Sequence, residues 1–177
     1  MFHLSDLVRM YENFALEDPQ IKDFIEKIKG FVEQQSHMPL HYFQVNEQEG
    51  YCVLVFDTEQ NGKSFDVLVK DLNTGMMMPV LILNSLDEIA FDYGTQGFYY
   101  TQVDATGRGK KVFRHQLGSL QQQDLLIYEE VGQDFEVQVL NTLSHDYILI
   151  DIHSTFKPHT NEIWLRKCGE KSKFKLI

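Results

Sequence analysis

The sequence is poor in positive charge. Its 177 residues contain 16 Lys and Arg against 26 Asp and Glu, which gives a formal net charge of −10. A protein surface that follows the phosphates of a nucleic acid needs an excess of cations. The composition therefore predicts no nucleic-acid partner.

Cysteine and long apolar runs are also scarce. Cys52 and Cys168 stand far apart and form no Cys-x-x-Cys pair, so neither a disulfide framework nor a zinc site is indicated. Residues 1–6 lack the basic start and apolar stretch of a secretory signal. The longest apolar run, residues 76–83, is much shorter than the roughly 20 residues of a membrane-spanning helix. We expect a cytoplasmic protein without membrane contact.

Apolar residues recur at helical spacing only in the first part of the chain. Asp18 followed by Pro19 supplies an N-cap oxygen and a residue that loses nothing at the first helical position, so a helix is expected to begin there. We predict one or two helices in residues 1–42, based on the apolar positions Leu4, Leu7, Val8, Tyr11, Ile21, Phe24, Ile25, Ile28, Phe31 and Val32.

Residues 43–177 consist of short β-type runs separated by turn residues. Three pairs of runs are predicted as hairpins: 51–57 with 65–71, 97–103 with 111–117, and 147–153 with 162–166. Tyr51, Phe98 and Tyr147 in the first strands of these hairpins are 98 − 51 = 47 and 147 − 98 = 49 residues apart. Four short antiparallel strands every ~40 to 50 residues are typical of propeller blades. The periodicity alone also allows a β-sandwich. Further runs lie at residues 76–83, 89–92, 125–129 and 174–177.

The strands of the middle repeat carry a recognisable sequence. Residues 97–101 read GFYYT, residues 107–118 read GRGKKVFRHQLG and residues 124–130 read DLLIYEE. In this order and at these distances they resemble the propeller of the prolyl oligopeptidase family of serine peptidases, in particular oligopeptidase B and prolyl-endopeptidase-like proteins. Residues 69–75 (VKDLNTG) and 161–165 (NEIWL) resemble further strands of that propeller, and residues 28–39 resemble its approach to the first blade.

The resemblance implies a mainly β fold, with a partial β-propeller of about two to three four-stranded blades over residues 43–177 and the helical segment 1–42 before it. The likeness covers about residues 28–177 but only the front part of a family member. We therefore expect three parts to be missing: the bulk of the first blade between Pro39 and Tyr51, the later blades, and the catalytic α/β-hydrolase domain. That domain and short peptides are the partners that the resemblance implies.

Peptide hydrolysis by this family needs a serine in a Gly-x-Ser-x-Gly turn, with a histidine base and an orienting carboxylate. None of the eight serines lies in that frame, and the nearest approach is Gly118-Ser119-Leu120 in a predicted turn. We predict no catalytic residue in this chain, so any peptidase activity would belong to the missing domain.

Other reactive side chains have a structural interpretation. Asp151 and His153 share one strand face but His159 falls in a predicted loop, so we expect solvated polar residues, no metal and no cofactor. His115 alternates with apolar neighbours and is predicted to be a half-exposed strand residue. Cys52 lies in an apolar strand and is predicted to belong to the core.

Three local patterns are also interpreted as packing or surface features. The run Met76-Met77-Met78 is expected to fill irregular gaps. Neighbouring acids point to opposite faces of a strand, which makes Asp87-Glu88 and Glu129-Glu130 poor glycosidase pairs. Alternating lysines discourage pairing at an open sheet edge, and such edges also make self-association a prediction; these lysines are Lys171, Lys173 and Lys175.

Two functions remain open from the sequence. The first is the gating propeller of an oligopeptidase, truncated and without its own catalytic triad. The second is a stand-alone, non-catalytic binding module in which the blades and the helices bury their edges against a partner or against each other.

Overall fold

Short apolar runs form strands over most of the chain that the structure describes, which comprises residues 40–57, 62–156 and 161–177. The computed structural model contains, in chain order, β1 (Leu40–Asn46), β2 (Tyr51–Phe56), β3 (Phe65–Asp71), β4 (Met77–Phe91), β5 (Gly97–Val103), β6 (Gly109–Gln116), the 3-10 turn η1 (Gln121–Gln123), β7 (Leu125–Glu129), β8 (Phe135–Asn141), β9 (Tyr147–Ser154), β10 (Asn161–Lys167) and β11 (Lys175–Leu176). The prediction of a mainly β fold is confirmed.

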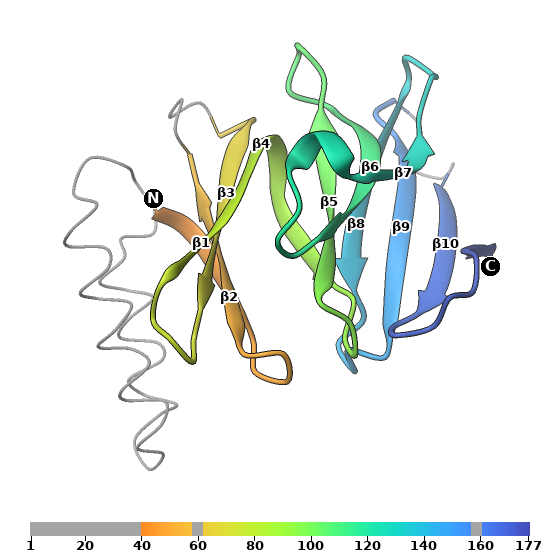
Figure 1. Cartoon of the computed structure of the whole chain (residues 1–177). Coiled ribbons are helices and arrows are strands. Elements are labelled where there is room, and N and C mark those ends of the chain that lie inside the picture. The colour runs from red at the N-terminus through yellow and green to blue at the C-terminus, as the bar shows by residue number, and fades with distance from the viewer. Residues whose placement is uncertain (1–39, 58–61, 157–160) are drawn as a thin grey trace, which may run out of the picture.

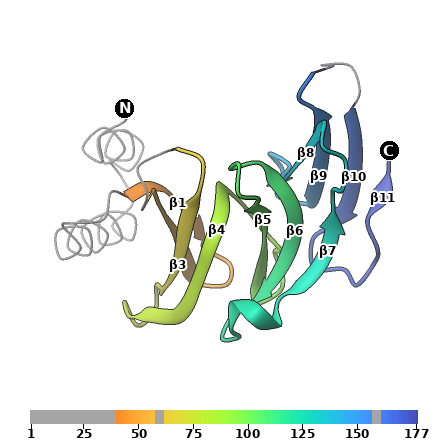
Figure 2. The same ribbon diagram turned by 90° about the horizontal axis from the view of Figure 1, so that it is seen from above.

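Strand pairing arranges these elements as three four-stranded antiparallel units. The first unit contains β1, β2, β3 and the first half of β4, and the second contains the second half of β4, β5, β6 and β7. The third contains β8 to β11. Figures 1 and 2 show the units side by side in chain order, and the view of Figure 2 shows that they fan apart. Within each unit, strands that follow one another in the chain pair with one another, so short connections are sufficient there.

A single strand, β4, belongs to two units. Val67 and Leu68 of β3 pair with its first half, and Tyr100, Tyr99 and Phe98 of β5 pair with its second half. Ser85 pairs with both neighbouring strands. Just before it, Asn84 has a left-handed φ of 59°, a conformation that asparagine tolerates better than most residues. This local reversal lets β4 leave one sheet and enter the next.

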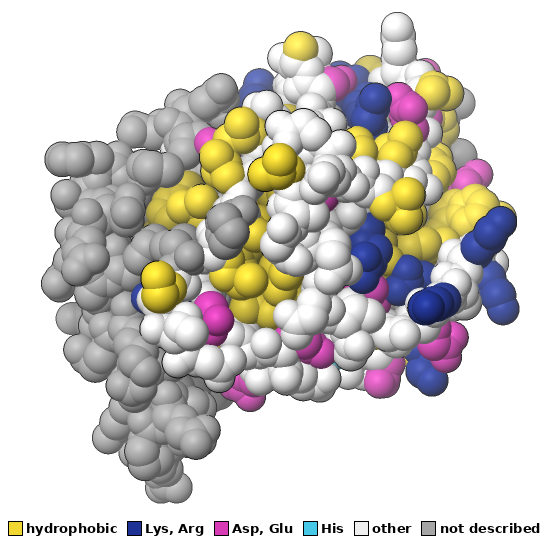
Figure 3. Space-filling model, in the orientation of Figure 1, with side chains coloured by type: hydrophobic (Ala, Val, Ile, Leu, Met, Phe, Trp, Pro, Cys, Tyr) yellow, Lys and Arg dark blue, Asp and Glu magenta, His cyan; other side chains and the backbone are white. Residues whose placement is uncertain are grey.

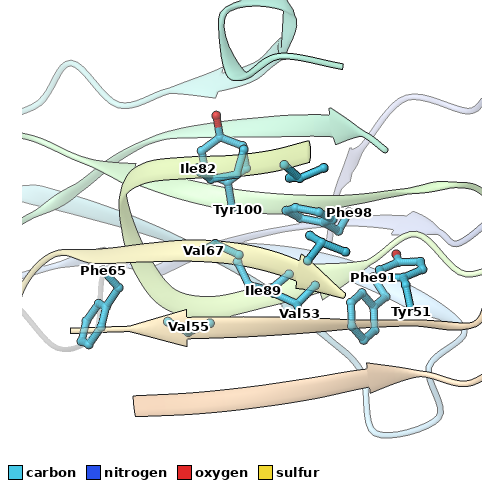
Figure 4. Packing of buried hydrophobic residues seen from close by; sticks show 12 residues of the cluster. Tyr51, Val53, Val55, Phe65, Val67, Ile82, Ile89, Phe91, Phe98 and Tyr100 are labelled. Atoms are coloured by element: carbon cyan, nitrogen blue, oxygen red, sulfur yellow. The ribbon is translucent and has the colours of Figure 1, made fainter. Parts of the chain in front are cut away.

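Two apolar clusters join the three units. The first lies between the first and second units and includes Tyr51, Val53 and Val55 of β2 together with Phe91, Phe98 and Tyr100. Figure 4 shows these side chains converging from both sheets. The second cluster joins the second and third units, and its buried members are Ala90, Tyr99, Val112, Val137, Val139, Ile148, Ile150 and Ile152. Burial on both faces of a sheet explains the nearly continuous apolar sequence of β2.

Close backbone approach also fixes the spacing of the second and third units. Gly109 begins β6, and a Cβ atom at this position would lie 2.2 Å from the carbonyl oxygen of Val137 in β8. Only glycine fits such a contact without movement of the backbone.

The structure confirms the three predicted hairpins and corrects two other expectations. Residues 76–83 and 89–92 are not separate strands but parts of β4. We expected the bulk of the first blade to be missing between Pro39 and Tyr51. Leu40–Asn46 nevertheless forms β1 and pairs with β2, so the first unit of the structure has four strands. The apolar positions predicted to form helices lie outside the described residues. The division at residue 43 therefore stays a prediction, although β1 already begins at Leu40.

Candidate functional site

The first strands of the three units lie next to one another and enclose a shallow cavity. β4 contacts both β1 and β8, and the cavity between them measures about 210 Å³. Polar and apolar side chains are mixed in its lining, which includes Tyr42, Gln44, Glu88, Leu140, Leu143 and His145. Concave surfaces of this kind, with a few polar groups among apolar ones, are the usual places for ligand contact.

Glu88 gives this cavity an acidic character. Partial burial raises the pKa of its carboxyl group above the ordinary value, and the neighbouring carboxylates of Asp87 and Asp151 raise it further. Asp87 itself contacts the Nε2 atom of His41 at 3.1 Å. None of the described residues that line the cavity is a serine or a cysteine. Its chemistry therefore suits the binding of a polar or cationic group, and offers no serine or cysteine nucleophile for covalent catalysis.

One side of the cavity is shaped by the turn between β8 and β9. His145 holds a left-handed φ of 61° in this turn, and its ring packs edge-on against Tyr93 of the second unit at 5.0 Å. Leu143 is fully exposed beside it. The turn thus presents an apolar tip next to the acidic wall.

A second, larger hollow of about 610 Å³ lies between the hairpin turns of the first two units, with Lys63, Asn84, Gln102 and Asp104 in its lining. The carboxylate of Asp104 is already engaged, because its Oδ1 atom accepts hydrogen bonds from the hydroxyl and the backbone of Thr106. Hydrogen bonds from the hydroxyl of Thr106 and from the backbone N–H groups of Arg108 and Thr106 lower the pKa of Asp104. The carboxylate of Asp104 therefore stabilises the turn that borders this hollow and is not available as a reactive group.

The outer strands present a different surface. Several leucines near η1 and on β4 and β7 are exposed, and Figure 3 shows hydrophobic side chains scattered over the face on which these elements lie. They are Leu81, Leu83, Leu120, Leu125 and Leu126. The acidic cavity and these leucines therefore lie on opposite margins of the sheets.

His115 is fully buried, which contradicts its prediction as a half-exposed residue. Its Nδ1 atom lies 2.7 Å from Oδ1 of Asp124, whose Oδ2 accepts a hydrogen bond from the Tyr100 hydroxyl at 2.9 Å. Burial raises the pKa of Tyr100 above its ordinary value. A histidine paired with a carboxylate resembles part of a catalytic triad, but both side chains are inaccessible to solvent. The Nε2 atom of His115 has no hydrogen-bond partner in the described part of the chain. The contacts of Asp124 with His115 and Tyr100 connect β6 and β5 to the segment before β7.

A second buried network surrounds Asp92, at the end of β4. Its two carboxylate oxygens lie 2.9 and 2.8 Å from Nη2 of Arg166 in β10. Nε of Arg114 donates to Oδ2 at 3.2 Å, and the backbone N–H of Gly169 donates to Oδ1 at 3.0 Å. Arg166 also donates to the Tyr99 hydroxyl. Asp92 thus joins the second unit to the third.

The remaining candidates fall into turns, core or surface. Ser119 donates to the carbonyl of Gln116 at 2.7 Å in a turn, as predicted. Cys52 is fully buried, which confirms its prediction as core, and burial raises the pKa of its thiol to about 12. Asp151 and His153 approach to 3.5 Å, whereas His159 lies outside the described residues. Over residues 40–57, 62–156 and 161–177, no three His, Cys, Asp or Glu side chains are grouped to hold a metal ion.

The acidic pairs and the C-terminal lysines also have separate surroundings. Glu129 pairs with Nζ of Lys111 at 2.9 Å, while Glu130 accepts from the Tyr128 hydroxyl at 3.0 Å. Of the three lysines, Lys175 alone lies in a strand, so the predicted lysine-lined strand is wrong beyond that position. Of the methionines at 76 and 78, Met78 packs against the first cluster and Met76 is exposed.

Three antiparallel four-stranded units, packed face to face with their first strands side by side, define a protein of the β-propeller class. Residues 30–177 match the family model described as the N-terminal β-propeller domain of prolyl oligopeptidase. The chain belongs to this family.

Two curated relatives and two solved structures are similar to the chain. Dipeptidyl aminopeptidase BI of Pseudoxanthomonas mexicana is 29% identical over 119 residues, which cover 64% of this chain and 16% of that protein. Protease 2 of Moraxella lacunata is 31% identical over 88 residues, 49% of this chain and 13% of that protein. Oligopeptidase B from Leishmania major superposes with a TM-score of 0.72 at 18% identity, covering 84% of this chain and 21% of that chain. Oligopeptidase B from Trypanosoma brucei, with covalently bound antipain, gives 0.67 at 16% identity, with 84% and 20% covered.

These similarities have a limited extent. The chain spans less than a quarter of the length of each relative and each structure. At these identities the solved structures show the fold alone. In the described residues, no helix is long and apolar enough to cross a membrane.

Proposed function

We propose that this chain acts as the gating part of an oligopeptidase, controlling the access of short peptides to a catalytic α/β-hydrolase domain that the chain itself does not contain. Membership of the propeller family carries this proposal. The division predicted from the sequence, a helical segment over residues 1–42 and a partial propeller over residues 43–177, belongs to the same proposal with its boundary moved to Leu40, where β1 begins. A cytoplasmic location belongs to it as well.

The absence of catalysis by the chain alone is part of this proposal. No serine stands in a Gly-x-Ser-x-Gly frame, and the paired His115 and Asp124 are buried beyond the reach of a substrate. The relatives have names that indicate peptidases. Hydrolysis in this chain would therefore depend on a partner domain.

The acidic cavity among β1, β4 and β8 supports a role in peptide contact. Glu88 lies in its wall, and an extended peptide offers amide groups and cationic ends or side chains that such a wall can bind. We infer that short peptides pass over this surface.

The experiment has two parts. The purified chain is first incubated with basic and prolyl fluorogenic peptides and with a serine-reactive fluorophosphonate; we expect neither turnover nor labelling, and either result would refute the absence of a site. The binding of a short basic peptide is then measured by calorimetry for the wild type and for Glu88→Lys. The matched control is Glu129→Lys, which changes charge at a distant exposed position. We expect Glu88→Lys to weaken binding about tenfold; equal binding by both variants would contradict a role of the cavity.

A stand-alone binding module is the second candidate. It is favoured by the sheet face of the third unit that no other described unit covers. Size-exclusion chromatography with light scattering separates the two candidates, because a module of this kind would be recovered with a partner or as an oligomer.

A further inference from the structure

The turn between β8 and β9 differs from the corresponding turns of the other two units. Each unit has a turn after its first strand, and Figure 1 shows the three turns at the same end of the molecule. A residue with a left-handed φ occurs in each: Gly50 at 72°, Gly94 at 83° and His145 at 61°. Glycine adopts this conformation without strain, whereas histidine adopts it at a cost. Strained residues of this kind cluster at binding sites, so the side chain of His145 is a candidate for a role beyond the turn.

The turn itself is stabilised without the imidazole ring. The backbone N–H of His145 donates to the carbonyl oxygen of Thr142 at 2.9 Å, and Oγ1 of Thr142 accepts a hydrogen bond from the backbone N–H of Tyr147 at 3.2 Å. The backbone N–H of Asp146 donates to Oγ of Ser144 at 3.4 Å. Among the residues that the structure describes, neither ring nitrogen of His145 has a hydrogen-bond or ion-pair partner. Both nitrogens are therefore available to a ligand.

A series of aromatic rings positions the imidazole at the cavity among β1, β4 and β8. The rings of Phe91 and Tyr93 pack edge-on with their centres 5.7 Å apart, and those of Tyr93 and His145 do so at 5.0 Å. Phe91 is fully buried in the first cluster, so this series begins in the core. Edge-on packing restricts the orientation of each ring. His145 and Glu88 both line the cavity, and the imidazole is thus held on a wall of the same site as the carboxylate.

The surroundings of His145 are acidic, which limits the kind of group that it can bind. Asp146 follows it directly in the chain, and Glu88 lies in the same cavity lining. The carboxylate of Glu49 lies beside the turn of the second unit, where it accepts a hydrogen bond from the backbone N–H of Gly94 at 2.7 Å. These charges would repel a carboxylate of a ligand but not an uncharged acceptor. A peptide supplies such an acceptor at every residue, in the form of its main-chain carbonyl oxygen.

We propose that His145 is a ligand-binding residue of the acidic cavity, and that its imidazole N–H donates a hydrogen bond to a main-chain carbonyl oxygen of the bound peptide. This inference rests on the peptide contact proposed above and adds a requirement to it. Glu88 attracts a cationic group on any molecule, whereas the contact with His145 requires a peptide bond next to that group. His145 thus distinguishes a peptide from other cations.

The test is calorimetric binding of three ligands to the full chain. Two are the free-acid and the C-terminal amide forms of one short basic peptide, and the third is agmatine, which has a guanidinium group but no carbonyl. His145→Gly gives the third unit the residue that the other two units have, so the turn is kept and the ring is lost. We expect this variant to bind both peptide forms about fivefold more weakly, as for the loss of one hydrogen bond, and to bind agmatine within about twofold of the wild type.

Ser144→Gly is the matched control, because it adds the same backbone freedom to the same turn at a residue that is not part of the cavity lining. We expect it to bind all three ligands within about twofold of the wild type. Melting temperatures show that both variants are folded, and that of His145→Gly is expected within about 3 °C of the wild type, because relief of backbone strain offsets the lost contact with Tyr93.

Several results would overturn the inference. Peptide binding by His145→Gly at the wild-type affinity would do so, as would an equal loss of agmatine binding, which would indicate general damage to the cavity. A loss confined to the free-acid peptide would reveal a contact with a carboxylate and not with a carbonyl group. Glu88→Lys tests the proposed function separately: if it weakens peptide binding and His145→Gly does not, the inference on His145 alone is wrong. A wild type that binds neither peptide overturns both.

Discussion

Asp92 shows how much a single residue contributes to the joining of two units. Its carboxylate is fully buried. Two arginines, from β6 and β10, neutralise its charge, and the backbone N–H of Gly169 donates a hydrogen bond to it. A buried carboxylate is tolerated when such partners compensate for the loss of water. Arg166 also stacks over the ring of Tyr99, with its guanidinium carbon 5.3 Å from the ring centre.

We expect Asp92→Asn to destabilise the protein by about 3 kcal/mol or more, because the buried guanidinium of Arg166 loses its counter-charge. The free energy of unfolding is measured by urea denaturation. The control is Glu129→Gln, which removes an exposed ion pair with Lys111 and should cost less than about 1 kcal/mol. Equal losses in the two variants would show that Asp92 has no special role in joining the units.

At this scale the sequence predicts types of side chain better than their partners. The apolar surroundings of Cys52 correctly indicate a core residue. For His115 the same alternation is misleading, because a buried histidine needs a partner and Asp124 lies nine positions away with no local signal. Asp92 is similarly unremarkable in the sequence, since its partner Arg166 lies 74 residues later.

Among the elements, β4 is the one on which the connection of the units depends. It runs from Met77 to Phe91, and Asn84 with a φ of 59° lies where the strand leaves β3 and approaches β5. Its side chain accepts a hydrogen bond from the Ser64 hydroxyl at 3.3 Å. The bend is therefore fixed by backbone conformation and by a contact to the preceding hairpin.

Substitutions at Asn84 should separate these two contributions. A β-branched residue is strained at positive φ, so Asn84→Val is expected to cost about 1–2 kcal/mol. Asn84→Gly permits the same φ and should cost less than about 1 kcal/mol. Thermal unfolding of the two variants provides the measurement, with Leu83→Val as a control at the preceding exposed position. If valine and glycine were equally tolerated, the left-handed conformation would not be required for the bend.

Hairpins were the most predictable elements. Alternating or apolar runs define β2 with β3, β5 with β6, and β9 with β10, and all three pairs form. The first two pairs are joined by glycine-containing turns and the third by a longer loop that holds Pro158. The continuity of β4 was not predictable, because Asn84 and Ser85 interrupt the apolar pattern as a turn would. β1 was missed because Leu40–Asn46 has a weak alternation and becomes a strand through its pairing with β2.

For the whole molecule, direct contact between backbone atoms, and not the length of the connecting segment, sets the distance between the second and third units. Gly109 of the second unit lies against the carbonyl oxygen of Val137 in the third, and the side chains of Leu86 and Thr101 complete the contact. A larger residue would push the sheets apart and loosen the second cluster along its length.

We expect Gly109→Ala to cost about 2 kcal/mol or more, since the added methyl group overlaps a backbone atom that cannot move alone. Gly118→Ala is the comparison: Gly118 lies in a turn with a φ of 86° and nothing lies within 4 Å of the added atom, so only backbone strain of about 1 kcal/mol is expected there. Chemical denaturation of both variants tests this difference. A smaller loss for Gly109→Ala than for Gly118→Ala would argue against tight spacing of the units.

The overall architecture could be predicted because repeat spacing and the strand sequences of the middle repeat agree. The relations between units could not, since they depend on residues from different repeats that meet only after folding, such as Gly109 with Val137. The candidate cavity could not be predicted for the same reason: Tyr42, Glu88 and Leu140 come from three units, and in the sequence only Glu88 stands out, as part of an acidic pair.

Because β4 is shared by the first two units, these units are connected more strongly to each other than the second is to the third. Strand β4 is hydrogen-bonded to β3 in the first unit and to β5 in the second. The two units therefore cannot separate unless β4 loses its hydrogen bonds to one of these strands. The third unit is held to the second by side-chain packing, by the Asp92 network, by hydrogen bonds such as those between the Asn141 side chain and the Phe91 backbone, and by the peptide link after β7. A force applied to the two ends of the described chain would thus detach the third unit first. Slow bending motions of the molecule would be concentrated at the interface between the second and third units.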